Sequence, residues 1–145
     1  MGYVVEGGTI KPLPKNIQVL QNYLESRISK QIVRFLGFTG YYRKFIKDYA
    51  LIAKSFSYLT KKAREFIWSD EQRRAFHTLK ASLMQKPVLQ LFRDDRETEL
   101  HTDASAEGFA AILLQKSEEN NELHPVYYSG QKTIDVRSKY HSYEL

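Results

Sequence analysis

Apolar residues in the first part of the chain recur three or four positions apart, which is the spacing of amphipathic helices. We predict four helices: residues 16–26, a second with Ser29 as its N-cap and an apolar stripe that reaches Tyr49, residues 51–61, and a fourth that opens at Ser69 and is closed by Pro87. Ser69 and Gln72 have the spacing of a capping box. A short β-type run at residues 3–5 and a Gly7-Gly8 turn precede the helices. The pattern predicts a small helical bundle.

The last part of the chain has the pattern of strands. Residues 97–103 alternate in polarity, residues 109–115 form a continuous apolar run, and residues 124–129 make a third strand after a polar turn. Short turns join antiparallel strands, so we predict a three-stranded antiparallel meander. Residues 137–145 begin a helix. The sheet is expected to be truncated, with an open edge through which two copies of the chain would form a homodimer.

The sign of the charge reverses between these two parts. Residues 1–93 carry 17 Lys and Arg against 6 Asp and Glu, a formal charge of +11, whereas residues 94–145 carry 5 against 11, a charge of −6. Such a reversal indicates a domain boundary. We therefore predict an α+β fold with a helical domain, 1–93, and a sheet domain, 94–145. The basic domain either attracts a polyanion or presents solvated helix faces, and composition does not separate these readings.

Composition excludes several classes of protein. The chain has no cysteine, so disulfide scaffolds, thiolate zinc sites and cysteine nucleophiles are ruled out. No apolar run approaches the about 20 residues that span a bilayer, so no membrane partner is expected. A reducing compartment is permitted, and we expect an intracellular protein of the cytoplasm or nucleus.

The predicted second helix contains a candidate nucleic-acid surface. Its members are Arg34, Gly37, Gly40, Arg43, Lys44 and Lys47. Two glycines inside a helix cost about 1 kcal/mol each relative to alanine, so their presence needs a reason. One reason is close packing of another helix on this face; the other is close approach of a phosphate backbone, which the neighbouring cations would neutralise. Both remain open at this point.

An ordered series of segments resembles reverse transcriptases of gypsy-type LTR retrotransposons. Residues 35–46, Phe-Leu-Gly-Phe-Thr-Gly-Tyr-Tyr-Arg-Lys-Phe-Ile, resemble the thumb segment of these enzymes. Thr102-Asp103-Ala104-Ser105, with Gly108 and Gln115, resembles the first two strands of the attached RNase H domain. Residues 124–129 resemble its third strand, and residues 140–145 the start of its first helix. The resemblance covers nearly the whole chain.

The resemblance implies a polyprotein that polymerises DNA and removes the RNA strand of a hybrid. It implies Mg²⁺ as cofactor and an RNA–DNA or DNA duplex as ligand. The fingers, the palm and its catalytic aspartates would precede residue 1, and the rest of RNase H would follow residue 145. These missing segments of the parent polyprotein are the expected partners.

Asp103 is the candidate catalytic and metal-binding residue. RNase H holds two metal ions with four carboxylates, because the attacking and leaving oxygens both need charge stabilisation. The resemblance places Asp103 at the family's first-strand aspartate, where it would bridge the metals. Glu144 matches the first glutamate of a Glu-x-Glu pair whose second member is the ligand, and the sequence stops at Leu145. We therefore expect an incomplete site and weak or absent Mg²⁺ binding.

Two functions follow from these features. The first is a fragment of a retrotransposon reverse transcriptase and ribonuclease H that binds duplexes without catalysis of its own. The alternative is a domesticated or truncated module that binds nucleic acid or protein. The parent family is enzymatic in both cases, and this chain alone is expected to be inactive.

Overall fold

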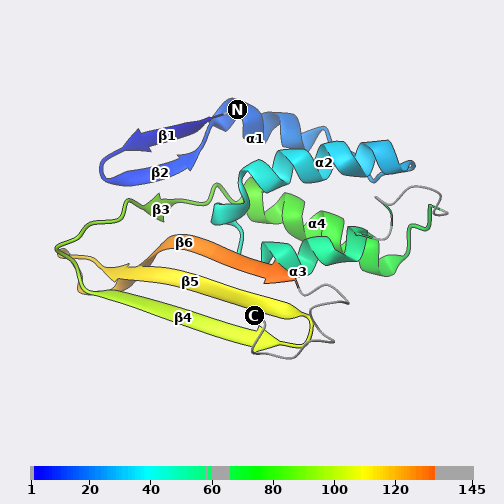
Figure 1. Cartoon of the computed structure of the whole chain (residues 1–145). Coiled ribbons are helices and arrows are strands. Elements are labelled where there is room, and N and C mark those ends of the chain that lie inside the picture. The colour runs from blue at the N-terminus through cyan, green and yellow to red at the C-terminus, as the bar shows by residue number, and fades with distance from the viewer. Residues whose placement is uncertain (1, 58, 60–65, 133–145) are drawn as a thin grey trace.

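The computed structural model describes residues 2–57, 59 and 66–132, and these adopt an α+β fold (Figure 1). The elements of the described residues are, in chain order, β1 (Tyr3–Glu6), β2 (Thr9–Pro12), α1 (Pro14–Gln21), α2 (Ser29–Tyr41), the 3₁₀ turn η1 (Arg43–Phe45), α3 (Tyr49–Ala53), the 3₁₀ turn η2 (Lys54–Phe56), α4 (Asp70–Met84), β3 (Leu89–Gln90), β4 (Thr98–Ser105), β5 (Gly108–Lys116) and β6 (Leu123–Lys132). The strands make two antiparallel sheets of three. No helix in this part of the chain has the length and apolar character needed to cross a membrane.

The first sheet is a small hairpin with one added strand. Gly7 and Gly8 have φ of +57° and +76°, which is the left-handed conformation that a two-residue hairpin turn requires. The predicted β-type run and turn are thus confirmed. Strand β2 also pairs with β3, so that Ile10 lies opposite Leu89. No sequence pattern indicates β3, because two residues are too few to show a period.

The second helix is shorter than predicted. It ends at Tyr41, and the chain then makes the η1 turn before Asp48 adopts a left-handed φ of +59°. The prediction of one helix to Tyr49 was wrong because Phe45 and Ile46 stay buried across the break. Apolar periodicity therefore continued where helical hydrogen bonding did not.

Other helix bounds also shift. Helix α1 begins at Pro14, where the missing N–H costs nothing, and it ends at Gln21. Ile28, not Ser29, is the N-cap residue of α2. The predicted third helix is present as α3 and η2, and residues 58, 60 and 61 of that prediction lie outside the described residues.

Helix α4 has the termini that the sequence predicts. The Ser69 backbone N–H donates to Gln72 Oε1 at 2.9 Å, which completes the capping box. Gln72 Nε2 also donates to the Ser55 carbonyl at 2.9 Å, so the cap ties α4 to η2. At the other end Lys86 turns out of the helix with φ of +55°, just before Pro87.

The core lies between α1, α2 and α4. Phe35 is fully buried and its ring lies 4.6 Å from that of Phe76, centroid to centroid. The ring of Phe56 also packs on Phe35, with a centroid distance of 6.5 Å. Glu25, in the connection after α1, forms hydrogen bonds at the start of α4. Its Oε1 accepts from Trp68 Nε1 at 2.7 Å, just before the helix, and from Arg73 Nε of α4 at 2.9 Å. These hydrogen bonds, that of Trp68 first, lower the pKa of the Glu25 carboxyl.

The second sheet has the order β4-β5-β6, which confirms the predicted antiparallel meander. A register shift at Leu113/Leu114 interrupts the β5–β6 pairing. Strand β6 lies beside the helices, whereas β4 forms the outer edge (Figure 1). On β4 the Leu100 side chain is 62% exposed. Pairing of two copies through this edge stays a prediction, as does the boundary between residues 93 and 94.

Candidate nucleic-acid interface

Asp103 lies on the outer strand β4, opposite Ala110 of β5. Its side chain is exposed and forms no hydrogen bond or ion pair with a described residue. On the same face of the strand His101 pairs with Glu99 at 3.0 Å. Within the part of the chain that the structure describes, no three His, Cys, Asp or Glu side chains come together as a metal site. The described residues therefore do not fit a Mg²⁺ site around Asp103, and Glu144 lies outside them.

Two of the candidate binding residues lie on the open surface of α2. Arg34 and Gly37 are both exposed and stand one turn apart. A Cβ atom at Gly37 would meet no atom within 4 Å outside its own part of the helix. Packing therefore does not explain a glycine at this position, whereas the approach of a ligand to the bare backbone remains a reason for it.

Gly40 has a packing role. A Cβ atom there would lie 3.2 Å from the Tyr49 hydroxyl, which α3 brings against α2. That hydroxyl donates to the Leu36 carbonyl at 3.2 Å and lies 3.1 Å from Thr39 Oγ1. Burial raises the pKa of Tyr49, so the ring stays a neutral phenol. The two glycines thus have different surroundings, although the sequence places them on one face.

The three cations after α2 also separate. Arg43 turns towards the second sheet, where its Nη2 donates to the Gly130 carbonyl at 3.5 Å. Its guanidinium carbon lies 5.3 Å from the centre of the Tyr49 ring of α3. The Lys44 ammonium sits 4.2 Å from the centre of the Tyr3 ring, in a cation–π contact with the β1 hairpin. Three sequence neighbours therefore serve different surfaces, because the 3₁₀ turn redirects each of them.

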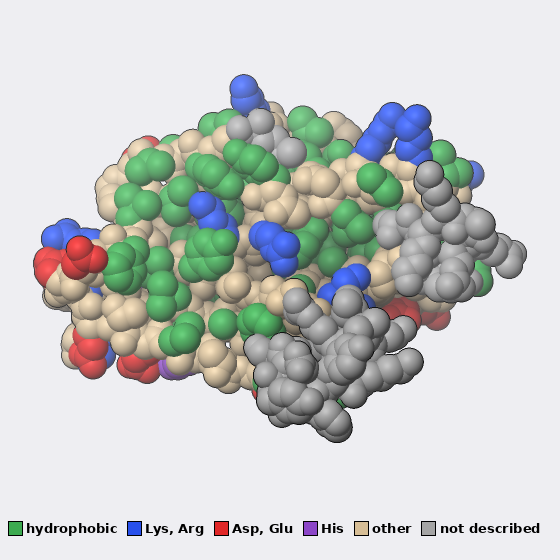
Figure 2. Space-filling view, viewed as in Figure 1, with side chains coloured by type: hydrophobic (Ala, Val, Ile, Leu, Met, Phe, Trp, Pro, Cys, Tyr) green, Lys and Arg blue, Asp and Glu red, His purple; other side chains and the backbone are tan. Residues whose placement is uncertain are grey.

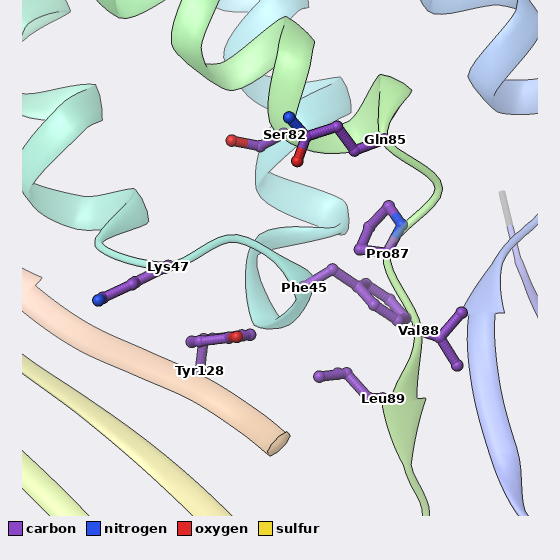
Figure 3. A pocket seen from close by; sticks show the side chains of 8 residues that line it. All are labelled: Phe45, Lys47, Ser82, Gln85, Pro87, Val88, Leu89 and Tyr128. Atoms are coloured by element: carbon purple, nitrogen blue, oxygen red, sulfur yellow. The ribbon is translucent and has the colours of Figure 1, made fainter. Parts of the chain in front are cut away.

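Lys47 lines a cavity of about 320 Å³ between the end of α4, β3 and β6. Figure 3 shows Ser82 and Gln85 on one side of this space, Phe45 and Pro87 on another, and Tyr128 of β6 facing them. The Lys47 side chain runs along the side next to β6 (Figure 3). This cavity marks one flank of the line where the helices meet the second sheet, which we call the seam.

The seam is basic. Figure 2 shows Lys and Arg side chains spaced across the middle of one face, along this line, whereas Asp and Glu side chains lie towards its edges. Two cations that the sequence analysis did not select belong here: Lys54 of η2 and Lys132 of β6 line one hollow together with Arg43. Lys132 comes from the acidic half of the chain, so no local pattern connected it with Arg43.

Comparison with known proteins gives the class of this molecule. Residues 68–145 match the family described as an RNase H-like domain found in reverse transcriptase. The chain is 35% identical over 145 residues to the retrovirus-related Pol polyprotein from transposon 297 of Drosophila melanogaster. It is 29% identical over 140 residues to the transposon Tf2-3 polyprotein of Schizosaccharomyces pombe. These alignments cover 99% and 97% of this chain but only 13% and 10% of those polyproteins.

Solved structures share the fold. A foamy viral protease-reverse transcriptase in complex with dsDNA aligns with a TM-score of 0.70 at 16% identity, over 99% of this chain and 31% of that one. The same viral protein in complex with an RNA/DNA hybrid gives 0.67 at 16% identity, over 94% of this chain and 19% of that one. Because the family model matches residues 68–145, more than half of the chain, the chain belongs to the RNase H-like family found in reverse transcriptases. The predicted resemblance to retrotransposon Pol polyproteins is confirmed by the two transposon relatives.

Proposed function

We propose that this chain is a nucleic-acid-binding part of a retrotransposon reverse transcriptase and ribonuclease H, and that its ligand is an RNA–DNA or DNA duplex. The observation that carries the proposal is the family match over residues 68–145. The basic seam supports it, because Lys and Arg side chains are free to neutralise backbone phosphates there. The foamy viral neighbours were solved with such duplexes bound.

The finer assignment is part of the same proposal. Residues 1–93 correspond to the thumb of a gypsy-type enzyme, and the parent polyprotein synthesises DNA on RNA and removes the RNA strand with Mg²⁺. In that parent Asp103 is a metal ligand. The hairpin, the helices and the second sheet of the described residues then serve to hold the duplex.

The first prediction is salt-dependent binding without sequence preference. Phosphate neutralisation releases counterions, so a surface that engages three phosphates loses about 40-fold in affinity between about 50 and 200 mM salt. Fluorescence anisotropy with a labelled RNA–DNA hybrid measures this, and a second hybrid of unrelated sequence is the control. Equal affinity at the two salt concentrations, or no binding at the lower one, would contradict the proposal.

The second prediction is that the 145-residue chain by itself does not cut the RNA strand of a hybrid. Two-metal hydrolysis needs several converging carboxylates, and among the described residues Asp103 belongs to no group of three or more His, Asp or Glu side chains. The assay incubates a labelled hybrid with the chain and Mg²⁺ or Mn²⁺, with Asp103→Asn in parallel. Cleavage by the unmutated 145-residue chain that is lost in Asp103→Asn refutes the prediction. Equal background in both leaves it intact.

A further inference from the structure

A hollow of about 380 Å³ lies on the seam, where the end of α2, the α3–η2 segment and the end of β6 meet. The charged residues among its described lining are all cations: Arg43 of η1, Lys54 of η2 and Lys132 of β6. Leu36 and Tyr49 supply part of its apolar wall. The hollow thus joins basic side chains from the helices with one from the sheet.

The wall beside Arg43 is firmly built. The Tyr49 hydroxyl donates to the Leu36 carbonyl of α2, which fixes the ring. The Arg43 guanidinium carbon lies 5.3 Å from the centre of this ring, in a cation–π contact. Arg43 Nη2 also donates to the Gly130 carbonyl of β6 at 3.5 Å. Arginine presents several N–H donors in a fixed plane, so a guanidinium held in this way still has donors left for an anion.

Among the described residues none of the three cations forms an ion pair with a carboxylate. The ion pairs there involve Lys11, Arg73, His77, Arg93, His101 and Lys116. Like charges gathered in one hollow repel each other, and a phosphate placed between them removes that repulsion. Charge complementarity therefore selects an anion as the occupant, and the open, elongated seam favours a chain of phosphates over a compact ligand.

We propose that this hollow binds the sugar-phosphate backbone of the duplex, with phosphate oxygens contacting Arg43 and Lys54 from the helices and Lys132 from the sheet. The inference rests on the proposed duplex binding and gives it a location. One consequence follows from the arrangement: the same stretch of backbone bridges both parts of the molecule, so binding strengthens the contact between β6 and the helices.

The test compares two variants of the full chain that lose equal charge. Lys54→Gln/Lys132→Gln, the hollow variant, removes two cations that line the hollow. Lys15→Gln/Lys30→Gln, the control variant, removes two exposed lysines that do not line it. Loss of two phosphate contacts is expected to reduce the slope of log affinity against log salt by about 1.8 and to weaken hybrid binding about tenfold or more. The control variant should keep the parent slope. Lys132→Arg keeps the charge and should bind like the parent chain.

The outcomes separate the two proposals. If the hollow variant retains its circular dichroism spectrum and binds with the slope and affinity of the control variant, the hollow is not the phosphate site, although duplex binding stands. If the hollow variant loses its fold, Lys132→Glu replaces it, and unchanged hybrid binding by Lys132→Glu overturns the inference. If the parent chain fails to bind the hybrid at low salt, both the duplex function and its location are refuted.

Discussion

Replacing Phe35 by alanine is expected to lower the free energy of unfolding by about 3–5 kcal/mol. The side chain is fully buried on α2 and contacts the rings of Tyr23, Phe56 and Phe76. Truncation removes the transfer free energy of the ring and leaves a cavity where three aromatic neighbours meet, and their own packing limits how far they move inward. Since a domain is stable by only about 5–15 kcal/mol, the loss takes a large share of the total.

Denaturant titration followed by circular dichroism measures this effect. Leu24→Ala is the matched control, because Leu24 is a large apolar residue of the same helical part but is 83% exposed. Its change is expected to stay within about 0.5 kcal/mol. A loss below about 1 kcal/mol in Phe35→Ala would show that the core closes over the cavity and that Phe35 is not central to it.

Periodicity predicted the helical core because burial follows it directly. Phe76, Leu79 and Leu83 recur at helical spacing in the sequence, Phe35 lies on the apolar stripe of the second helix, and all four are buried in the structure. The capping box and the Gly7-Gly8 turn were also predictable, since each depends on residues a few positions apart. The three-stranded meander followed for the same reason, from short turns between strand-like segments.

The end of α2 was not predictable from these signals. No proline lies between Tyr41 and Asp48. Tyr42 leaves the helical conformation at φ −103° and ψ +21°, and Ile46 is extended, yet neither residue type marks a helix end in the sequence. The bends that follow are settled by tertiary contacts such as that of the Tyr49 hydroxyl with the Leu36 carbonyl. Local spacing carries no information on such contacts.

The candidate interface shows the same limit. Arg43, Lys44 and Lys47 were grouped because they are close in sequence, and the turn sends them to three surroundings. Lys132 lies beside Arg43 only through the packing of β6 on the helices. The role of Asp103 depended on a family resemblance from the start, and the described residues do not place it in a group of three or more ligand-type side chains.

Replacing Gly108 by valine is expected to lower the free energy of unfolding by about 2–4 kcal/mol, the combined cost of backbone strain and overpacking. Gly108 begins β5 with φ of +154°, which residues with side chains rarely adopt. A Cβ atom there would lie 2.4 Å from the Gln131 carbonyl oxygen, 2.8 Å from Lys132 Cα and 3.1 Å from Leu51 Cδ2. Backbone on the β6 side cannot yield as the flexible Leu51 side chain would, so β6 must move away from β5.

Ala104→Val is the matched control, because Ala104 is exposed on the neighbouring strand β4 and a β-branched residue suits that position. Its stability is expected to change by no more than about 0.5 kcal/mol. Denaturant titration compares the two variants, and amide exchange of β6 locates the loss.

Because Gln131 and Lys132 also line the basic hollow, Gly108→Val should weaken hybrid binding as well. A Gly108→Val chain as stable as Ala104→Val would mean that β5 and β6 tolerate a side chain here, and that the close approach of these strands does not fix the position of Lys132.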